Sequence, residues 1–326
     1  MIMIQKLEAL LKCFSVESAC LMQSNNGGEP LVSVVMTIFN AEKYLAESLA
    51  CISRQTYTNW ELIAVENGST DQSIEILNEI ADPRVKKHFL PNNIGRTPAL
   101  QFGLEHALGK YVAVLDADDL CSETRFDKQV KFLENNPKVI VVGTWFDEID
   151  AESKVVEERR PPTDNTSIID MMSFSNPILH SSSMYRRVDA LRVGGYNEKY
   201  RYGADTNLWV SLMGLGEAAI ISENLASYRV YPGNLTNQRN YAREVYRDGF
   251  LVYQRAAREL PVSDSAKRRN RHTVTASQIL LGRALIWDRD ILRGCWHIVR
   301  GVLRDPVGIA RSNRVRALLR LAGRKN

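Results

Sequence analysis

The sequence predicts an α/β protein with a mainly parallel sheet, helices on the faces of that sheet, and a helical C-terminal extension. Short apolar runs rich in β-branched residues alternate with segments of helical periodicity between residues 31 and 115, as in βαβ units. From about Tyr241 the chain is helical in pattern and rich in Arg. A chain of 326 residues with 44% apolar and 25% charged residues is an ordinary globular protein.

Three regions are predicted along the chain. Residues 1–29 form a helix and linker, residues 30–240 form the catalytic α/β domain, and residues 241–326 form a basic helical region. The first helix covers residues 1–22, where apolar side chains recur at helical spacing: Ile4, Leu7, Leu10, Leu11 and Phe14. Residues 24–30, with three Gly or Pro and two Asn, then read as a linker.

The elements of the α/β domain follow in order from residue 31. Predicted strands cover residues 31–36, 61–65, 85–90 and 111–115, and predicted helices cover residues 41–55, 69–80 and 97–108. Asn40 is expected to cap the first of these helices, and Ser69, Thr70 or Asp71 the second. From about Val139 the pattern loosens, and only a strand at 184–187 and a helix at 203–214 are predicted before Tyr241.

Charge and cysteine usage limit the class of protein. The five Cys residues are scattered and form no C-x-x-C pair, which fits a reducing cytosol better than a disulfide framework or a zinc site. No basic segment followed by an apolar core marks a signal peptide at the N-terminus, and no apolar run approaches the roughly 18 residues of a membrane span. A cytoplasmic protein is therefore expected.

The net charge of +4 is unevenly distributed. From Gly301 onward there are seven Arg or Lys residues and one Asp. Such a tail is suited to an anionic membrane surface, here the inner face of the cell membrane, or is simply a solvated helix face. The basic run at 267–271 contains no aromatic residue, so nucleic acid is not an expected partner.

The strongest chemical signal is the segment Asp116-Ala117-Asp118-Asp119, directly after a predicted buried strand. Three carboxylates in four residues repel one another unless a cation neutralises them. Mg²⁺ or Mn²⁺ does this while leaving coordination positions for phosphate oxygens. The alternative is an N-terminal cap for a helix that begins near Glu123. Ligands bind beyond the carboxyl ends of parallel strands, which favours the metal and phosphate interpretation.

Two further loops follow predicted strands. In the first, Glu66 and Asn67 precede Gly68, and the Glu66 carboxylate is a candidate acceptor for a base or ribose; an ordinary strand-to-helix turn explains the loop without it. In the second, Asn93, Gly95 and Arg96 precede a helix and are candidates to present backbone N–H groups and a guanidinium to a phosphate. An ordinary turn is the alternative there too.

Together these segments resemble glycosyltransferase family 2, whose members share the GT-A fold and invert the anomeric configuration of the sugar. The resemblance covers roughly residues 31–235. The matching segments are VSVVMTIFN (32–40), VENGSTD (65–71), NIGR (93–96), LDADD (115–119), NPILH (176–180), GGYNE (194–198), GADTNLW (203–209) and YRVY (228–231).

The resemblance implies a role for each matching position. Asp205 corresponds to the general base that deprotonates the acceptor hydroxyl, and Asp118 to the ligand of a divalent metal, Mn²⁺ or Mg²⁺. Asp116 would hold the ribose or donor sugar. The remaining predicted donor or nucleotide contacts are Thr37, Phe39, Asn40, Glu66, Asn67, Asn93, Gly95, Arg96 and Ala117. Predicted acceptor or phosphate contacts are His180, Trp209 and Tyr231; His180 is equally well explained as a structural histidine, and Asp205 as an exposed carboxylate at a helix start.

The implied activity is transfer of a single sugar from a nucleotide-diphosphate sugar to a glycan or lipid-linked glycan, in bacterial cell-surface polysaccharide assembly. A processive polymerase is disfavoured by the absence of membrane spans and of the family's Gln-x-x-Arg-Trp sequence. A nucleotidyltransferase would need a Gly-rich phosphate loop that is missing. Departures from the family pattern at Glu66, Ala204 and Tyr231 support the alternative of a catalytically silent nucleotide-sugar-binding or scaffold protein.

Overall fold

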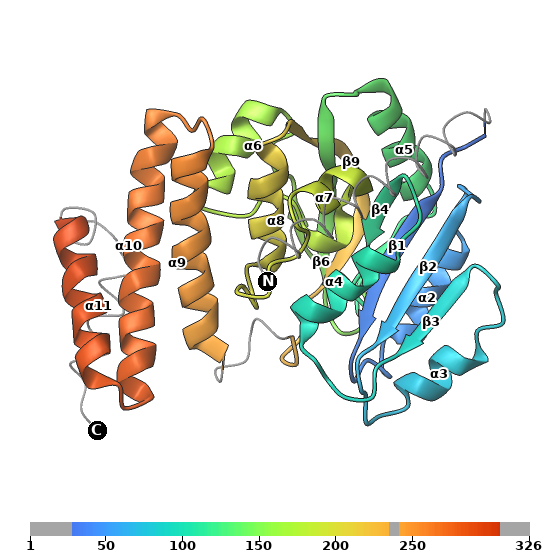
Figure 1. Cartoon of the computed structure of the whole chain (residues 1–326), viewed down its shortest axis with the longest axis horizontal. Coiled ribbons are helices and arrows are strands. Elements are labelled where there is room, and N and C mark those ends of the chain that lie inside the picture. The colour runs from blue at the N-terminus through green and yellow to red at the C-terminus, as the bar shows by residue number, and fades with distance from the viewer. Residues whose placement is uncertain (1–27, 235–240, 307–326) are drawn as a thin grey trace, which may run out of the picture. The chain divides into compact units, whose positions relative to one another are not determined.

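The computed structural model describes residues 28–234 and 241–306 (Figure 1). The helix predicted over residues 1–22 and the basic residues after 306 lie outside the described residues. Contacts divide the chain into two compact units. The first comprises the chain up to Asn165 with Ile178–Lys199 and Ser211–Tyr231, and the second comprises Thr166–Pro177, Tyr200–Val210 and the chain from Pro232.

A single sheet of nine strands organises the described part of the first unit. The strands are β1 Val32–Ile38, β2 Trp60–Glu66, β3 Val85–Phe89, β4 Tyr111–Val114, β5 Leu120–Cys121, β6 Val139–Ile149, β7 Val155–Arg159, β8 Met184–Arg186 and β9 Glu217–Arg229. Their order is β3-β2-β1-β4-β8-β6-β9-β5, and β7 pairs with β6 at the side. The α/β class predicted from the sequence is confirmed.

Parallel pairing is concentrated in the first half of this sheet. β1 pairs in parallel with β2 and with β4, and β2 pairs in parallel with β3. β8 then runs antiparallel to both β4 and β6, and β6 pairs in parallel with β9. The strands β6 and β9 are long but were not predicted from the sequence, because polar residues and shifts in register interrupt their alternation.

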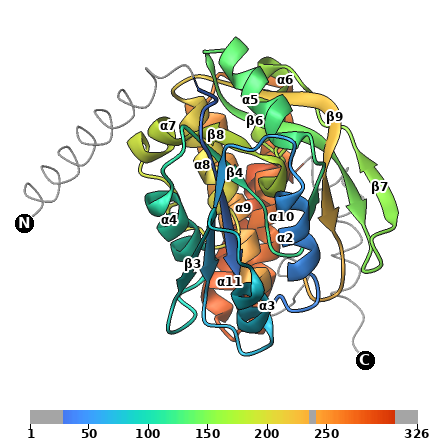
Figure 2. The same ribbon diagram turned by 90° about the vertical axis from the view of Figure 1, so that its right-hand side faces the viewer.

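Helices cover both faces of the parallel strands. They are α2 Leu45–Ser53, α3 Ser73–Glu79, α4 Arg96–His106, α5 Arg125–Asn135 and α7 Arg187–Arg192, with the short 3₁₀ helix η1 at His180–Ser182. α2 and α4 lie on opposite faces of β1 and β2 (Figure 2). Successive strand residues point to opposite faces, so Val34 and Met36 pack in the core on the α2 side, while Ile63 and Val65 pack against Ala99 of α4.

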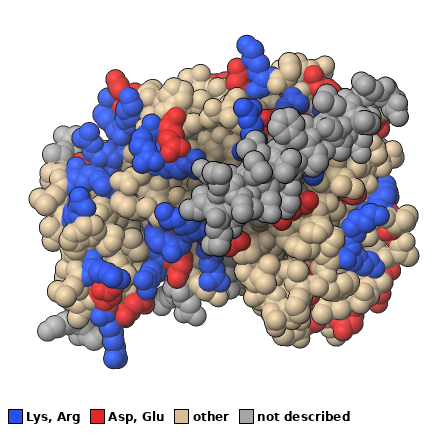
Figure 3. Space-filling view, viewed as in Figure 1, with Lys and Arg blue, Asp and Glu red and all other residues tan. Residues whose placement is uncertain are grey.

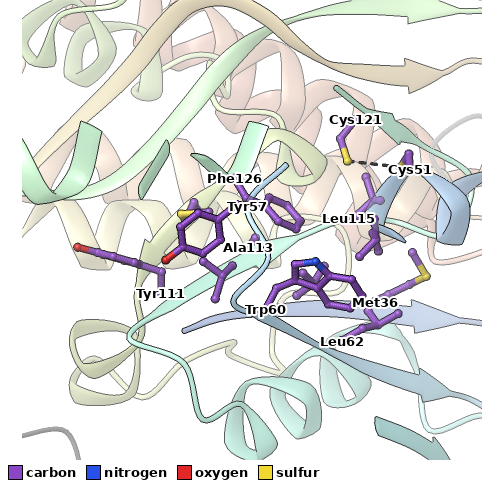
Figure 4. Close-up of a cluster of buried hydrophobic side chains, with 14 of the residues drawn as sticks. Met36, Cys51, Tyr57, Trp60, Leu62, Tyr111, Ala113, Leu115, Cys121 and Phe126 are labelled. Atoms are coloured by element: carbon purple, nitrogen blue, oxygen red, sulfur yellow. Dashed lines mark hydrogen bonds between the residues drawn. The ribbon is translucent and has the colours of Figure 1, made fainter. Parts of the chain in front are cut away.

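The larger core cluster is drawn in Figure 4. Met36, Leu62, Tyr111 and Phe126, from β1, β2, β4 and α5, are all buried. At its edge the thiols of Cys51 and Cys121 are 3.4 Å apart, and neither forms a disulfide.

The second unit is helical. It contains most of α6 (Asn165–Met172) and α8 (Ala204–Met213), and all of α9 (Ala242–Glu259), α10 (Asp264–Trp287) and α11 (Ile291–Arg304). Ser263 caps α10 by accepting a hydrogen bond from Ala266 N at 3.2 Å, and its own N–H and hydroxyl donate to the Asp170 carboxylate. The predicted helical extension is therefore confirmed. Over the described residues, no helix is long and apolar enough to cross a membrane.

Candidate active site

The candidate site of the first unit is built from the loops that follow β1, β2, β3 and β4. Because these four strands are parallel, their carboxyl ends meet at one edge of the sheet, which is where such sheets bind ligands. Side-chain hydrogen bonds join the loops to one another.

Asn40, after β1, joins the first loop to the second. Its backbone has φ of +50°, and α2 begins only at Leu45, so the prediction that Asn40 caps this helix is wrong. The Asn40 Oδ1 atom instead accepts a hydrogen bond from Thr70 N at 2.9 Å, and Asn40 N donates to Ser69 Oγ at 3.0 Å. Asn tolerates this left-handed conformation better than most residues.

Thr37 and Phe39 flank the same strand end. Thr37 is half-buried in β1, and the Phe39 side chain is 46% exposed. An exposed aromatic ring at the edge of the sheet where ligands bind can stack on a nucleotide base. Contact of either side chain with a nucleoside stays a prediction.

Glu66 closes the second loop. Its buried carboxylate accepts hydrogen bonds from Gly68 N at 3.1 Å and Ser69 N at 2.7 Å. The predicted caps of the next helix are partly wrong, since the residue before α3 is Gln72, although Asp71 accepts a hydrogen bond from Ser73 N at 3.0 Å. Glu66 thus holds its own loop, and recognition of a base by Glu66 stays a prediction.

Asn67 joins the second loop to the third. The Asn67 Nδ2 atom donates to Asn93 Oδ1 at 3.2 Å, and Asn67 Oδ1 accepts from Ile94 N at 3.0 Å. Asn93 Oδ1 also accepts from Gly95 N at 2.8 Å. Gly95 has φ of +95°, a conformation that favours glycine.

Gly68 is required by the close approach of these two loops. Its φ is +74°, and a Cβ atom there would lie 2.6 Å from Asn93 N. We expect Gly68→Ala to lower the free energy of unfolding by roughly 2–4 kcal/mol, because left-handed strain and overpacking add. Gly194→Ala is a matched control, since Gly194 has φ of +88° and a Cβ atom added there would meet no atom within 4 Å.

Denaturant unfolding of the two variants measures this difference. The control carries the backbone strain alone, so it is expected to lose roughly 1–2 kcal/mol. Equal losses in both variants would show that contact between the two loops contributes nothing.

Asp116, just after β4 in the fourth loop, is paired with a cation. Arg96 Nη2 lies 2.8 Å from both Asp116 oxygens and 2.8 Å from His180 Nδ1. Burial opposes the charged carboxylate, but the Arg96 guanidinium holds the pKa of Asp116 well below its usual range. Arg96 thus contacts Asp116, and its predicted contact with a phosphate stays a prediction.

Asp118 has different surroundings. Its half-buried carboxylate accepts a hydrogen bond from Tyr231 Oη at 3.1 Å, and no Lys or Arg of the described residues forms a salt bridge with it. Burial and the negative charge of Asp116 raise the pKa of Asp118 above its usual value. The carboxylates of Asp116 and Asp118 therefore differ: Arg96 neutralises Asp116, and no cationic side chain of the described residues pairs with Asp118.

Asp119 is part of the framework of the loop. It is fully buried, accepts a hydrogen bond from Arg229 N at 2.8 Å, and accepts another from the Ser181 hydroxyl. Burial and Asp118 raise its pKa well above the usual value. The helix that follows begins at Arg125 after Thr124, so the alternative interpretation of the triplet as a helix cap is wrong.

Three buried side chains that support this loop were not predicted from the sequence. Arg229 Nε donates to Asp118 O at 2.9 Å, and Ser181 Oγ accepts from Asp116 N at 3.1 Å. Arg125 Nη2 donates to Val114 O at 2.8 Å, while its Nη1 donates to Ser181 O. Buried Arg side chains are rare unless paired, and no sequence pattern marks these two.

The residues at this loop fit a divalent cation. Asp118 presents carboxylate oxygens that no Lys or Arg of the described residues pairs with, and such oxygens suit a hard ion such as Mn²⁺ or Mg²⁺. Within residues 28–234 and 241–306, no three His, Cys, Asp or Glu side chains gather to form a complete metal site. A metal held here by Asp118 would therefore need further oxygen ligands, and donor phosphates supply such ligands to Mg²⁺ in many enzymes.

His180 lies beside Asp116 in the first unit. It is buried, with Nε2 2.9 Å from Tyr196 Oη. Because a guanidinium can only donate, the contact with Arg96 requires His180 Nδ1 to accept, which places the proton on Nε2. These contacts give His180 a structural position; its predicted contact with phosphate or acceptor stays a prediction, as does that of Tyr231.

Asp205 lies in the second unit, in the first turn of α8. The half-buried carboxylate accepts hydrogen bonds from Thr206 N at 2.7 Å through Oδ1 and from Asn176 Nδ2 at 3.0 Å through Oδ2. The preceding segment is held by the buried Asp248 of α9, which accepts from Arg201 N and Tyr202 N at 2.7 and 2.8 Å. Neither Asn176 nor Asp248 was predicted as a support from the sequence.

Trp209 lies one turn further along α8 and is fully buried. The indole therefore belongs to the packed interior of the described structure. Its predicted contact with the acceptor stays a prediction.

Comparisons with known proteins agree with this geometry. The family model "Glycosyl transferase family 2" matches residues 33–195. An uncharacterized glycosyltransferase of Haemophilus influenzae is 33% identical over 69% of this chain and 74% of its own length. The amylovoran biosynthesis glycosyltransferase AmsE of Erwinia amylovora is 30% identical over 57% of this chain and 71% of its own length.

Two solved structures share the fold. TarS 1–349 of S. aureus, in complex with UDP-GlcNAc, has a TM-score of 0.61 at 16% identity and covers 81% of each chain. The mannosyltransferase PcManGT of Pyrobaculum calidifontis, in complex with GDP-Man and Mn²⁺, has a TM-score of 0.56 at 18% identity and covers 96% of this chain and 86% of its own. The chain is therefore a glycosyltransferase of family 2 with a GT-A fold.

Proposed function

We propose that this chain transfers a single sugar from a nucleotide-diphosphate sugar to a glycan or lipid-linked glycan, with inversion at the anomeric carbon. The observation that carries the proposal is the difference between the surroundings of the Asp116 and Asp118 carboxylates in the fourth loop. Arg96 neutralises Asp116 at 2.8 Å, whereas the Asp118 carboxylate accepts a hydrogen bond from the uncharged Tyr231 hydroxyl. One carboxylate is thus ready to accept sugar or ribose hydroxyls, and the other to bind a cation.

Each residue then has one task in the reaction. Asp116, fixed by Arg96, accepts hydrogen bonds from donor hydroxyls, and Asp118 would hold the divalent metal. Such a metal, when bound, neutralises negative charge on the departing nucleoside diphosphate. The loops that carry Phe39, Glu66 and Asn67 would bind the nucleoside.

Asp205 is proposed as the general base. Its carboxylate takes the proton of the acceptor hydroxyl while that oxygen forms a bond to the anomeric carbon. The bond from this carbon to the diphosphate oxygen breaks on the opposite side, which inverts the configuration. The hydrogen bonds from Thr206 and Asn176 orient the carboxylate, since a general base must be held within reach of the proton that it removes.

The biological setting is part of the proposal. AmsE, by its name, acts in amylovoran biosynthesis, and this supports a role in bacterial cell-surface polysaccharide assembly. The named ligands of TarS and PcManGT, UDP-GlcNAc and GDP-Man, support a nucleotide-sugar donor, and Mn²⁺ in the second supports a divalent metal. The two nucleotides differ, so the proposal leaves the base open.

A thermal-shift screen tests the donor site. The protein is heated with UDP-, GDP- or dTDP-sugars in the presence of Mn²⁺ or Mg²⁺, and with EDTA as the control. We expect one nucleotide family to raise Tm in a metal-dependent way, because a ligand that binds only the native state stabilises it. No metal-dependent shift with any of the donors would contradict the proposed site.

A further inference from the structure

The last described helix of the second unit, α11, has two opposite apolar faces. One contains Gly294 and Gly301, which are buried. A Cβ atom on Gly294 would lie 2.6 Å from Gly282 O, and one on Gly301 would lie 2.7 Å from Ile279 Cγ1. This glycine face therefore packs closely against α10, and the remainder of α11 is turned away from its partner helix.

The other apolar face is exposed. Its large side chains have exposed fractions between 40% for Val302 and 87% for Leu292. At 100° per residue, they fall within an arc of about 140° on the helix. The members of this exposed face are Ile291, Leu292, Trp296, Val299, Val302 and Leu303. Trp287, at the end of α10, is also 71% exposed.

Positive charge borders the exposed face. α11 contains Arg293, Arg300 and Arg304 and no Asp or Glu. On the helical projection the exposed Arg293 and Arg300 follow directly after the apolar arc, whereas the Arg304 guanidinium lies 5.3 Å from the centre of the Phe250 ring of α9. The Arg300 guanidinium lies 4.7 Å from the centre of the Trp296 ring. In Figure 3 blue Lys and Arg side chains predominate over red ones on the part of the surface formed by α9–α11.

We propose that the exposed face of α11 binds the surface of an anionic lipid bilayer, with the helix lying in the plane of the membrane. Apolar side chains with Trp on one face and Arg beside them are the features of interfacial helices. The Leu, Val and Ile side chains enter the acyl boundary, Trp296 lies at headgroup level, and the Arg293 and Arg300 side chains reach lipid phosphates. Scattered exposed apolar residues are ordinary on soluble proteins, but a continuous face of this kind marks an interaction site.

Charge favours a membrane over a second copy of this chain. An antiparallel symmetric contact between two α11 helices would bring the two Arg rows to the same side, and like charges across an interface are costly. The nearest acidic group, the N-cap Asp290, already pairs with Arg293 of its own helix at 3.6 Å. An anionic lipid surface instead complements the Arg residues. The inference does not depend on sugar transfer.

Flotation of the full chain with vesicles tests the inference. The vesicles contain phosphatidylcholine alone or a mixture with phosphatidylglycerol at about 30%, enough to give a strongly anionic surface. We expect binding to the anionic vesicles, and a loss of at least about tenfold in Leu292→Glu/Leu303→Glu, because the helix face then carries charges that the bilayer core rejects. In Arg293→Gln/Arg300→Gln we expect a loss on the order of tenfold, with weaker dependence on salt.

Leu108→Glu is the matched control, since Leu108 is 60% exposed in the first unit, and we expect it to bind as wild type does. Thermal unfolding confirms that each variant is folded.

Failure of wild type to float with anionic vesicles would overturn the inference. The inference would also be overturned if light scattering showed that the wild type is a dimer and that Leu292→Glu/Leu303→Glu is a monomer. The exposed face of α11 would then bind a second copy of the chain. Nucleotide release from a donor in solution is measured separately. It shows whether a protein that does not bind vesicles still has the proposed activity.

Discussion

Asp205→Asn is expected to lower turnover by roughly 10²–10⁴-fold, the usual cost of removing a general base. Asn keeps the shape of the side chain and can still accept the hydrogen bond from Thr206 N through Oδ1. Its amide nitrogen cannot accept the hydrogen bond from Asn176 Nδ2 and cannot take up the acceptor proton. Donor affinity should change little, because Asp205 is proposed to act on the acceptor. Steady-state turnover and donor binding, measured on the same preparation, check both statements.

Asp264→Asn is the control for this variant. Asp264 is a carboxylate of the second unit whose side chain is 86% exposed, and its replacement should leave turnover unchanged. Wild-type turnover in Asp205→Asn would remove Asp205 from the mechanism. An equal fall in donor affinity and turnover would make it a donor contact instead.

Asp118→Asn is expected to abolish the dependence of donor binding on metal. In wild type, Mn²⁺ should tighten donor binding; in the variant, the affinity measured with Mn²⁺ should fall on the order of 10²-fold, since a metal contact to charged oxygens contributes several kcal/mol. The substitution keeps an acceptor for the Tyr231 hydroxyl, which lies 3.1 Å from Asp118 in the native protein. Calorimetric titration of the donor with Mn²⁺ and with EDTA measures the effect.

Glu123→Gln provides the matched control. Glu123 follows the same loop, and its side chain is 57% exposed in a salt bridge with Arg54. Such exposed pairs contribute little, so donor binding in this variant should retain its response to Mn²⁺. If Asp118→Asn also retains it, the metal ligand lies elsewhere.

The parallel half of the sheet was predictable because its strands carry their own signal. β1, β2 and β4 are buried along nearly their whole length, so each appears in the sequence as a continuous apolar run. β6 and β9 were not predictable in this way. Their burial is interrupted by exposed or half-exposed residues, and their pairing depends on partners that lie far away in the chain.

The donor loops were predictable for a related reason. Each follows a recognisable strand, and the chemistry of Glu66, Asn93 or Asp118 is visible in a few consecutive residues. The prediction that Asn40 caps a helix was wrong for a local reason. Asn is common both at helix caps and in left-handed conformations, and the hydrogen bonds of Asn40 with Ser69 and Thr70 favour the second.

The supports of the site could not be predicted. Arg229 reaches Asp118 O across 111 positions of sequence, and Ser181 reaches Asp116 N across 65. An isolated Arg or Ser in a sequence is normally an exposed residue. Only the fold shows that Arg125 and Arg229 are buried and bonded to the loops that carry the carboxylates.

Release of nucleoside diphosphate is the most direct test of the central claim, that this chain is an active, metal-dependent glycosyltransferase with its donor held at Asp116 and Asp118. Wild-type protein is incubated with the donor that stabilises it, a glycan or lipid-linked acceptor extract, and Mn²⁺ or Mg²⁺. We expect release that requires the acceptor, stops when EDTA removes the metal, and is lost in Asp118→Asn. Metal-dependent donor binding without acceptor-dependent release from any extract would contradict the claim, and would identify a catalytically silent nucleotide-sugar-binding protein.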